Sequence, residues 1–117
     1  MKTIQFIIIF AGFIFLVTLP AHAQKKELTT KFRVEGVCDQ CKKRIENAAY
    51  LNGIKHCEWD KETEILTVVY NSDKVSLDAI HKSIAKAGHE TEKEEADSVA
   101  YSKLPKCCAY KGNVHKH

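Results

Sequence analysis

The chain has 117 residues, with 18 Lys and Arg against 15 Asp and Glu and a formal net charge of +3 at pH 7. This length provides for one small domain and excludes two. The near balance of charge excludes the basic footprint of a nucleic-acid-binding protein. The five cysteines are an odd number, so they cannot all form disulfides within one molecule.

Residues 1–23 are predicted to be a secretory signal peptide, with Lys2, an apolar run over 4–19 and a small-x-small cleavage site at Ala21-His22-Ala23. A membrane anchor is the alternative, but the run is shorter than the roughly 20 apolar residues that span a bilayer. Removal of these 23 residues from the 117 would leave 94. We expect a periplasmic or secreted product without stable membrane insertion.

Residues 24–30 are polar and predict a flexible lead-in. Phe32 and Val34 then alternate with charged residues, which predicts a half-buried strand over 31–36. Apolar residues with helical spacing predict a helix from Cys41 to Leu51, with Asp39 as its N-cap and Asn52-Gly53 as its end. The residues of its inner face are Cys41, Ile45, Ala48 and Ala49.

Two further strands are predicted over 54–60 and 65–70, joined by a hairpin at 61–64. In the first of them, Cys57 is interpreted as a small buried apolar residue rather than a ligand. A second helix over 77–87 would be capped by Ser76 and end at Gly88.

A charged edge strand is predicted over 89–94. The resulting βαββαβ order is the ferredoxin-like arrangement, an α+β fold with two helices on one face of a four-stranded antiparallel sheet. The extension over 95–117 is predicted to form a short helix before Pro105, with Val99 and Leu104 as apolar anchors.

Cys38-Asp39-Gln40-Cys41 is the motif that carries chemistry, because it joins the first strand to the first helix. Two thiols at this spacing can bind one soft metal ion or form one disulfide. The thiolate is the ligand and nucleophile, and a helix N-terminus with neighbouring cations lowers a cysteine pKa. The cations Lys42, Lys43 and Arg44 follow directly, so the position favours thiolates.

Residues 31–94 resemble the heavy-metal-associated domain of copper chaperones, copper-transporting ATPases and periplasmic mercury-binding proteins. The resemblance rests on segments in matching order: Gly36, Cys38, Cys41, Ile45-Glu46-Asn47-Ala48, Leu51-Asn52-Gly53-Ile54, Val68-Val69-Tyr70 and Ala85-Lys86-Ala87-Gly88. It implies that Cys38 and Cys41 bind one soft ion on an exposed loop and pass it by ligand exchange to a metal-transporting membrane protein or another acceptor. The family's usual Gly-Met-x-Cys is here the shorter Gly36-Val37-Cys38.

Cu(I) is the favoured ion, because thiolates select soft metals and Cu(I) accepts low coordination. The resemblance keeps Hg(II) open. Zn(II) prefers about four ligands, so it would need His89 or the C-terminal cysteines as well. His56 and His81 are expected at the surface, whereas His115 and His117 could bind Cu(II) or Zn(II) weakly.

A thiol-disulfide oxidoreductase with the same motif is the alternative from another class, and a structural Cys38–Cys41 disulfide is a third interpretation. The short mature chain and the βαββαβ order argue against the enzyme. We therefore expect a monomeric metal-binding protein that is not an enzyme.

Cys107 and Cys108 lie outside the resemblance. Adjacent cysteines are too constrained to pair easily with each other, so each must be free, bridged elsewhere or a ligand. Leu104 would dock the extension on the domain and Pro105 would redirect the chain. We predict that Cys107 or Cys108 approaches Cys38 and Cys41, as a third sulfur ligand or in a disulfide.

Overall fold

The fold was analysed in a computed structural model, which describes residues 26–112. The predicted signal peptide over 1–23 and the tail histidines His115 and His117 lie outside the described residues. Within 26–112, no helix combines the length and apolar character that a membrane span requires. The elements in chain order are β1 (Glu27–Arg33), α1 (Asp39–Ala49), β2 (Ile54–Trp59), β3 (Ile65–Asn71), α2 (Leu77–Lys86), α3 (Ser98–Ser102) and the 3-10 helix η1 (Lys106–Cys108).

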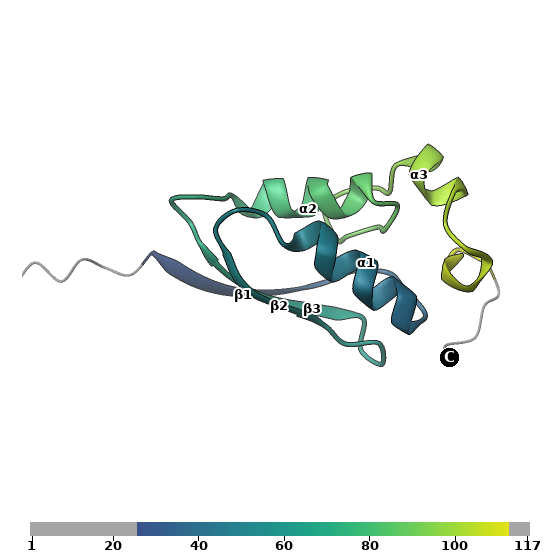
Figure 1. The fold of residues 1–117 in the computed structure, drawn as a ribbon, viewed down its shortest axis with the longest axis horizontal. Coiled ribbons are helices and arrows are strands. Elements are labelled where there is room, and N and C mark those ends of the chain that lie inside the picture. Colours follow the sequence, from purple (N-terminus) through teal and green to yellow (C-terminus); the bar gives the residue numbers. More distant parts are fainter. Residues whose placement is uncertain (1–25, 113–117) are drawn as a thin grey trace, which may run out of the picture.

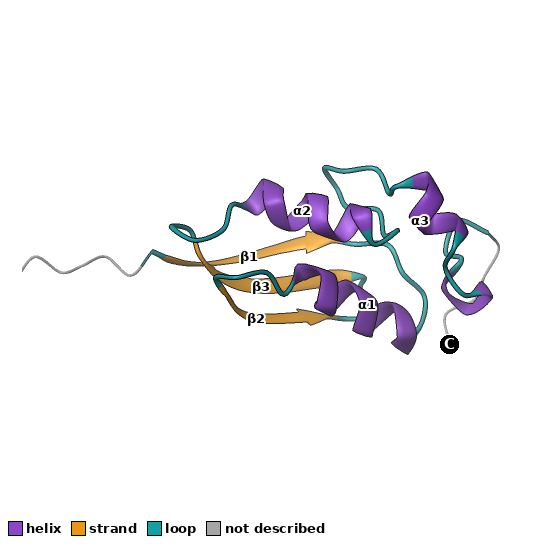
Figure 2. Cartoon of the chain, turned by 45° about the horizontal axis from the view of Figure 1, so that its top comes forward, coloured by secondary structure: helices purple, strands orange, loops and turns teal. Residues whose placement is uncertain are grey.

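Three strands form an antiparallel sheet in the order β1-β3-β2 (Figure 2). β1 pairs with β3 from Glu27 opposite Asn71 to Arg33 opposite Ile65. β2 pairs with β3 from Ile54 opposite Tyr70 onward, with a register shift before His56. β3 is therefore the central strand of the sheet and pairs along both of its edges.

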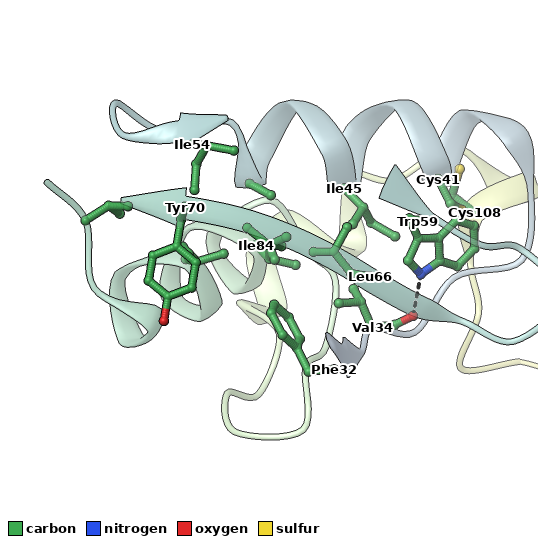
Figure 3. Packing of buried hydrophobic residues seen from close by; sticks show 14 of the residues in the cluster. Phe32, Val34, Cys41, Ile45, Ile54, Trp59, Leu66, Tyr70, Ile84 and Cys108 are labelled. Atoms are coloured by element: carbon green, nitrogen blue, oxygen red, sulfur yellow. Dashed lines mark hydrogen bonds between the residues drawn. The ribbon is translucent and has the colours of Figure 1, made fainter. Parts of the chain in front are cut away.

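Both α1 and α2 cover the same face of the sheet (Figure 1). Between the two layers lies one hydrophobic core, part of which Figure 3 shows. Its fully buried members from the strands include Trp59, Leu66 and Val68, and those from the helices include Ile45, Ile80 and Ile84. This two-layer packing confirms the predicted α+β ferredoxin-like class, although the described sheet has three strands.

The predicted fourth strand over 89–94 is reduced to a single bridge pair between Val34 and Thr91. The cause is a turn that the Thr91 side chain stabilises. Thr91 Oγ1 accepts hydrogen bonds from the backbone N–H groups of Lys93 (3.2 Å) and Glu94 (3.0 Å), and Thr91 N donates to the Glu94 carbonyl at 3.0 Å. A hydroxyl that binds its own backbone in this way competes with sheet pairing.

The predicted flexible lead-in is wrong from Glu27 onward, because β1 begins there and pairs with the end of β3. The first helix begins at Asp39, so Cys38 rather than Asp39 occupies the N-cap position. His81, expected at the surface, is buried: its Nδ1 lies 2.7 Å from Thr91 Oγ1 and its ring packs 3.9 Å from that of Phe32.

The C-terminal extension packs against the end of the domain that carries the start of α1 (Figure 1). Gly88 makes this close approach possible, because a Cβ there would lie 3.0 Å from the backbone of Ala100 and of Tyr101. Leu104 packs against the core as predicted, whereas Val99 is 60% exposed and does not anchor the segment. The extension therefore docks through the α3 backbone against Gly88 and through Leu104 against the core, and not through Val99.

Candidate metal centre

Cys38 and Cys41 lie at the first turn of α1, where the local structure brings their side chains together. Cys38 has an extended backbone (φ −149°, ψ 172°), and its carbonyl accepts the first intrahelical hydrogen bond from Lys42 N at 3.1 Å. Cys41 then falls one turn later on the buried face of the helix. As a result, the two Sγ atoms lie 3.1 Å apart.

Cys108 brings a third sulfur to this pair. Its Sγ lies 3.3 Å from that of Cys38, although 70 positions separate the two residues. The sulfurs of Cys38, Cys41 and Cys108 all lie within 4.8 Å of one another, and all three side chains are buried. The prediction that a C-terminal cysteine approaches the motif is confirmed, and the residue is Cys108.

All five cysteines are free thiols, so no disulfide prevents the three sulfurs from binding a metal ion. Burial tends to raise the pKa of Cys38, but hydrogen bonds from the Cys41 thiol, the Cys41 backbone and the Cys108 thiol outweigh it and lower the pKa. Burial raises the pKa of Cys41 to about 12. The predicted lowering of the thiol pKa therefore holds for Cys38 and is reversed for Cys41.

The basic residues after the motif do not all face these sulfurs. Lys42 Nζ donates to Glu46 Oε2 at 2.7 Å and to the Trp59 carbonyl at 3.0 Å. Glu46 Oε2 also accepts from Trp59 N at 2.8 Å. Lys42 thus connects α1 to the end of β2, and hydrogen bonds from neighbouring thiols and backbone groups lower the pKa of Cys38.

Trp59 lies beside Cys41 and Cys108 in the core (Figure 3). Its ring is 1% exposed, and Nε1 donates to the Val34 carbonyl at 2.9 Å. A Cβ at Gly36 would lie 2.9 Å from Trp59 Cζ2 and 3.1 Å from Cys41 Cβ. The loop before Cys38 therefore requires a glycine at 36, where it packs between Trp59 and Cys41.

Cys107 remains outside the set of three. Its Sγ lies 3.8 Å from that of Cys108 and 3.3 Å from Gln40 Oε1, to which the thiol donates. Cys107 and Gln40 line a pocket of about 210 Å³, together with Cys38 and Asp39. Gln40 was not predicted as a contributor, and its position inside the motif is the one sequence feature that pointed to it.

His89, predicted as an additional ligand, is fully buried but is not part of the cysteine set. Its Nδ1 lies 2.8 Å from the Glu35 carbonyl, which can only accept, so Nδ1 carries the proton. Burial lowers the pKa of His89 to about 4. His89 therefore acts as a neutral support for the loop that leads to Cys38.

Tyr110, which sequence analysis did not identify, holds the C-terminal extension against His89. The rings of Tyr110 and His89 stack at 5.4 Å. Tyr110 Oη donates to the Gly88 carbonyl at 2.7 Å and accepts from Glu90 N at 3.0 Å. Because Tyr110 follows Cys108 by two residues, these contacts also hold Cys108 in place.

Cys57 and His56 take no part in the cluster. Cys57 is half-buried in β2, packs against the core and donates to the Glu46 carbonyl at 3.4 Å. His56 is exposed, as predicted, with a contact of 3.6 Å to Glu58. Three sulfur donors in an apolar, buried setting fit a soft metal ion, because thiolates are the ligands that such ions prefer.

Comparisons with known proteins agree with this geometry. The chain matches the family described as Heavy-metal-associated domain over residues 31–90. No curated protein matches the chain. Among solved structures, the N-terminal domain of a potential copper-translocating P-type ATPase from Bacillus subtilis, in its Cu(I)-loaded state, is 28% identical, with a TM-score of 0.52 over 61% of this chain and 92% of that one.

Two further structures share the fold. The CopZ metallochaperone is 24% identical, with a TM-score of 0.53 over 55% of this chain and 98% of that one. Oxidized MerP from Ralstonia metallidurans CH34 is also 24% identical, with a TM-score of 0.53 over 58% of this chain and 99% of that one. From the family match over residues 31–90 and the CxxC motif at the start of its first helix, this chain belongs to the heavy-metal-associated domain family.

Proposed function

We propose that this chain is an exported protein that binds one soft metal ion, Cu(I) in the first place, through Cys38, Cys41 and Cys108, and passes it on by exchange of thiolate ligands. The observation that carries the proposal is the cluster of three buried sulfurs within 4.8 Å of one another. Export is inferred from the signal peptide predicted over residues 1–23.

The choice of Cu(I) follows from the donor set. Thiolates without a nitrogen or oxygen ligand favour soft ions, and three sulfurs provide too few ligands for the usual four-coordinate structural zinc site. Hg(II) shares these preferences, and a solved MerP structure is among the structural relatives. A competition between Cu(I), Hg(II) and Zn(II) for the purified protein would rank the three ions.

A metal-transporting membrane protein is the acceptor that best fits this role. The Cu(I)-loaded ATPase domain from Bacillus subtilis shares the fold at 28% identity, so a donor and an acceptor of this kind would present similar metal loops to each other. We propose that the chain acts as a monomer in this exchange. Lys43 is an exposed cation beside the site and would favour encounter with an acidic surface.

A binding role fits the cluster better than thiol-disulfide catalysis, the alternative from another class. The nucleophile of such an enzyme has to reach a disulfide in its substrate. Cys38, whose pKa is the one lowered, is only 4% exposed, and Cys41 is 0% exposed. A buried sulfur of this kind can bind an ion that enters the site, but it cannot contact a protein disulfide without movement of the extension.

An anaerobic Cu(I) titration against a competing chelator tests the proposal. We expect one tightly bound ion per chain, and we expect Cys38→Ser, Cys41→Ser and Cys108→Ser each to weaken the affinity by at least about tenfold, which is 1.4 kcal/mol. Cys57→Ser is the matched control, because its thiol lies outside the cluster. Weak Cu(I) binding by the unaltered protein, together with turnover of a disulfide substrate, would contradict the proposal.

A further inference from the structure

The three sulfurs proposed to hold the metal are shielded from solvent. Cys38 is 4% exposed, and Cys41 and Cys108 are both 0% exposed. Ligand exchange requires an incoming sulfur to contact the metal before a resident sulfur leaves. A thiol of an acceptor protein cannot make that contact directly while the extension covers the cluster, so transfer needs a further sulfur that connects the cluster to the surface.

Cys107 has the position that such a sulfur requires. Its Sγ lies 3.8 Å from that of Cys108, which makes it the next sulfur beyond the cluster. Unlike the three buried thiols, it is partly exposed. It also lines the pocket of about 210 Å³ whose other walls are Cys38, Asp39 and Gln40, so the pocket joins a cluster sulfur to Cys107.

The orientation of Cys107 is fixed by a neighbour from the CxxC motif. The Cys107 thiol donates to Gln40 Oε1 at 3.3 Å, across 67 positions of sequence. η1, which carries Cys107, packs against α1. The thiol is therefore held at the rim of the site and is not a freely moving surface side chain.

We propose that Cys107 is the exchange ligand of this centre: it binds the metal transiently as the ion enters or leaves the three-sulfur site through the pocket beside Gln40. This assignment rests on the metal binding proposed above. It gives the adjacent cysteines different roles, with Cys108 as a resident ligand and Cys107 as the ligand of transfer.

The step is a ligand substitution in which no electron moves between metal and sulfur. The Cys107 thiol releases its proton to solvent and forms a metal–sulfur bond. The bond to Cys41 breaks, because Cys41 is the last sulfur in the series of contacts that runs from Cys107 through Cys108 and Cys38, and the Cys41 thiolate takes up a proton. A thiolate of the acceptor then binds the metal, and the bonds to Cys108, Cys38 and finally Cys107 break in turn. Each released thiolate takes up a proton from solvent.

The test compares rates with equilibrium affinity in the full mature chain loaded anaerobically with Cu(I). Stopped-flow mixing with excess bathocuproine disulfonate measures loss of the ion, and the reverse mixing measures uptake. For Cys107→Ser we expect both rates to fall by about tenfold or more, while the affinity stays within about twofold of the unaltered protein. Both rates must fall together, since a residue absent from the resting site changes the barrier and not the equilibrium.

Alkylation provides a second readout, which does not depend on a substitution. Iodoacetamide should modify Cys107 in the Cu(I)-loaded protein, while Cys38, Cys41 and Cys108 are protected by the metal. The modified protein should then lose Cu(I) as slowly as Cys107→Ser. Cys57→Ser is the matched control and should leave both rates unchanged.

Each other outcome contradicts the assignment in a recognisable way. Unchanged rates in Cys107→Ser would mean that the metal leaves without this thiol. A loss of affinity of tenfold or more, or protection of Cys107 from alkylation, would make it a resident ligand. If the unaltered protein binds no Cu(I), the proposed function itself is wrong, and this result is distinct from the previous two.

Discussion

Cys108 Sγ lies 3.3 Å from Cys38 Sγ, so a residue of the C-terminal extension completes a cluster that begins at the first helix of the domain. The family match ends at residue 90, before the extension. The shared domain therefore supplies two of the three sulfurs, and the docking of the extension supplies the third. The contacts that hold the extension should control the metal site.

Tyr110→Phe tests that dependence. The substitution removes the hydroxyl that donates to the Gly88 carbonyl and accepts from Glu90 N, and leaves both backbone groups without that partner. We expect a cost of about 1 to 3 kcal/mol in the free energy of unfolding, measured in urea, and weaker Cu(I) binding. Tyr50→Phe is the control, since Tyr50 is 61% exposed. Equal Cu(I) affinity in the two variants would show that Tyr110 does not position Cys108.

Gly88→Ala and Gly53→Ala form a second matched pair. Both glycines have positive φ angles, +98° and +101°, so alanine strains the backbone by about 1 to 3 kcal/mol at either position. At Gly88 the new Cβ would also meet the backbone of Ala100 and Tyr101, whereas at Gly53 it would meet Lys74 and Val75. Thermal unfolding should report destabilisation in both variants. Only Gly88→Ala should weaken Cu(I) binding, and a similar loss in Gly53→Ala would contradict this account.

The stability of the metal-free protein should decrease in mild acid because of His89. Burial lowers its pKa to about 4, below the unfolded value of 6.5. Between these values the unfolded chain binds a proton that the folded chain does not, so stability falls as the pH falls from 6.5 to 4, by up to about 3 kcal/mol. His89→Phe should flatten this part of the curve in urea unfolding experiments, and His56→Gln, at an exposed position, should not. If both variants lose stability equally as the pH falls from 6.5 to 4, His89 is not the cause of the acid sensitivity.

The affinity for Cu(I) should depend on pH as well, but near neutral pH rather than in mild acid. Because burial raises the pKa of Cys41 to about 12, this thiol is protonated at neutral pH and must lose its proton when the metal binds. The logarithm of the Cu(I) affinity should therefore rise by at least about one for each pH unit between about pH 6 and pH 8. Chelator competition over that range measures the slope. A flat profile would mean that Cys41 is not a ligand or is already ionised.

Local patterns were sufficient to predict most of the domain. The alternation around Phe32 and the helical spacing from Cys41 onward placed the first strand and the first helix, because these patterns report which side of an element is buried. The start of β1 was missed, since Glu27 belongs to the strand through its pairing with Asn71 and not through its own apolar pattern. Leu28, next to it, is 49% exposed.

The failures at the second half of the chain have a common physical cause. His81 is buried because Thr91 and Phe32 meet its ring, and Thr91 also closes the turn that replaces the fourth strand. Neither contact leaves a local pattern in the sequence. The approach of Cys107 or Cys108 was predicted from Leu104, which docks the extension, and Pro105, which redirects the chain. That Cys108 is the one that joins the cluster, and the roles of Gln40 and Tyr110, depend on how the extension docks.

The central claim is that a bound Cu(I) ion has three sulfur ligands, one of them from the extension. X-ray absorption at the copper edge counts those ligands directly in the loaded protein. The account predicts three sulfurs per copper in the unaltered protein and in Cys107→Ser, and two in Cys108→Ser. Two sulfurs in the unaltered protein, with no change in Cys108→Ser, would contradict it and leave Cys38 and Cys41 as the whole site.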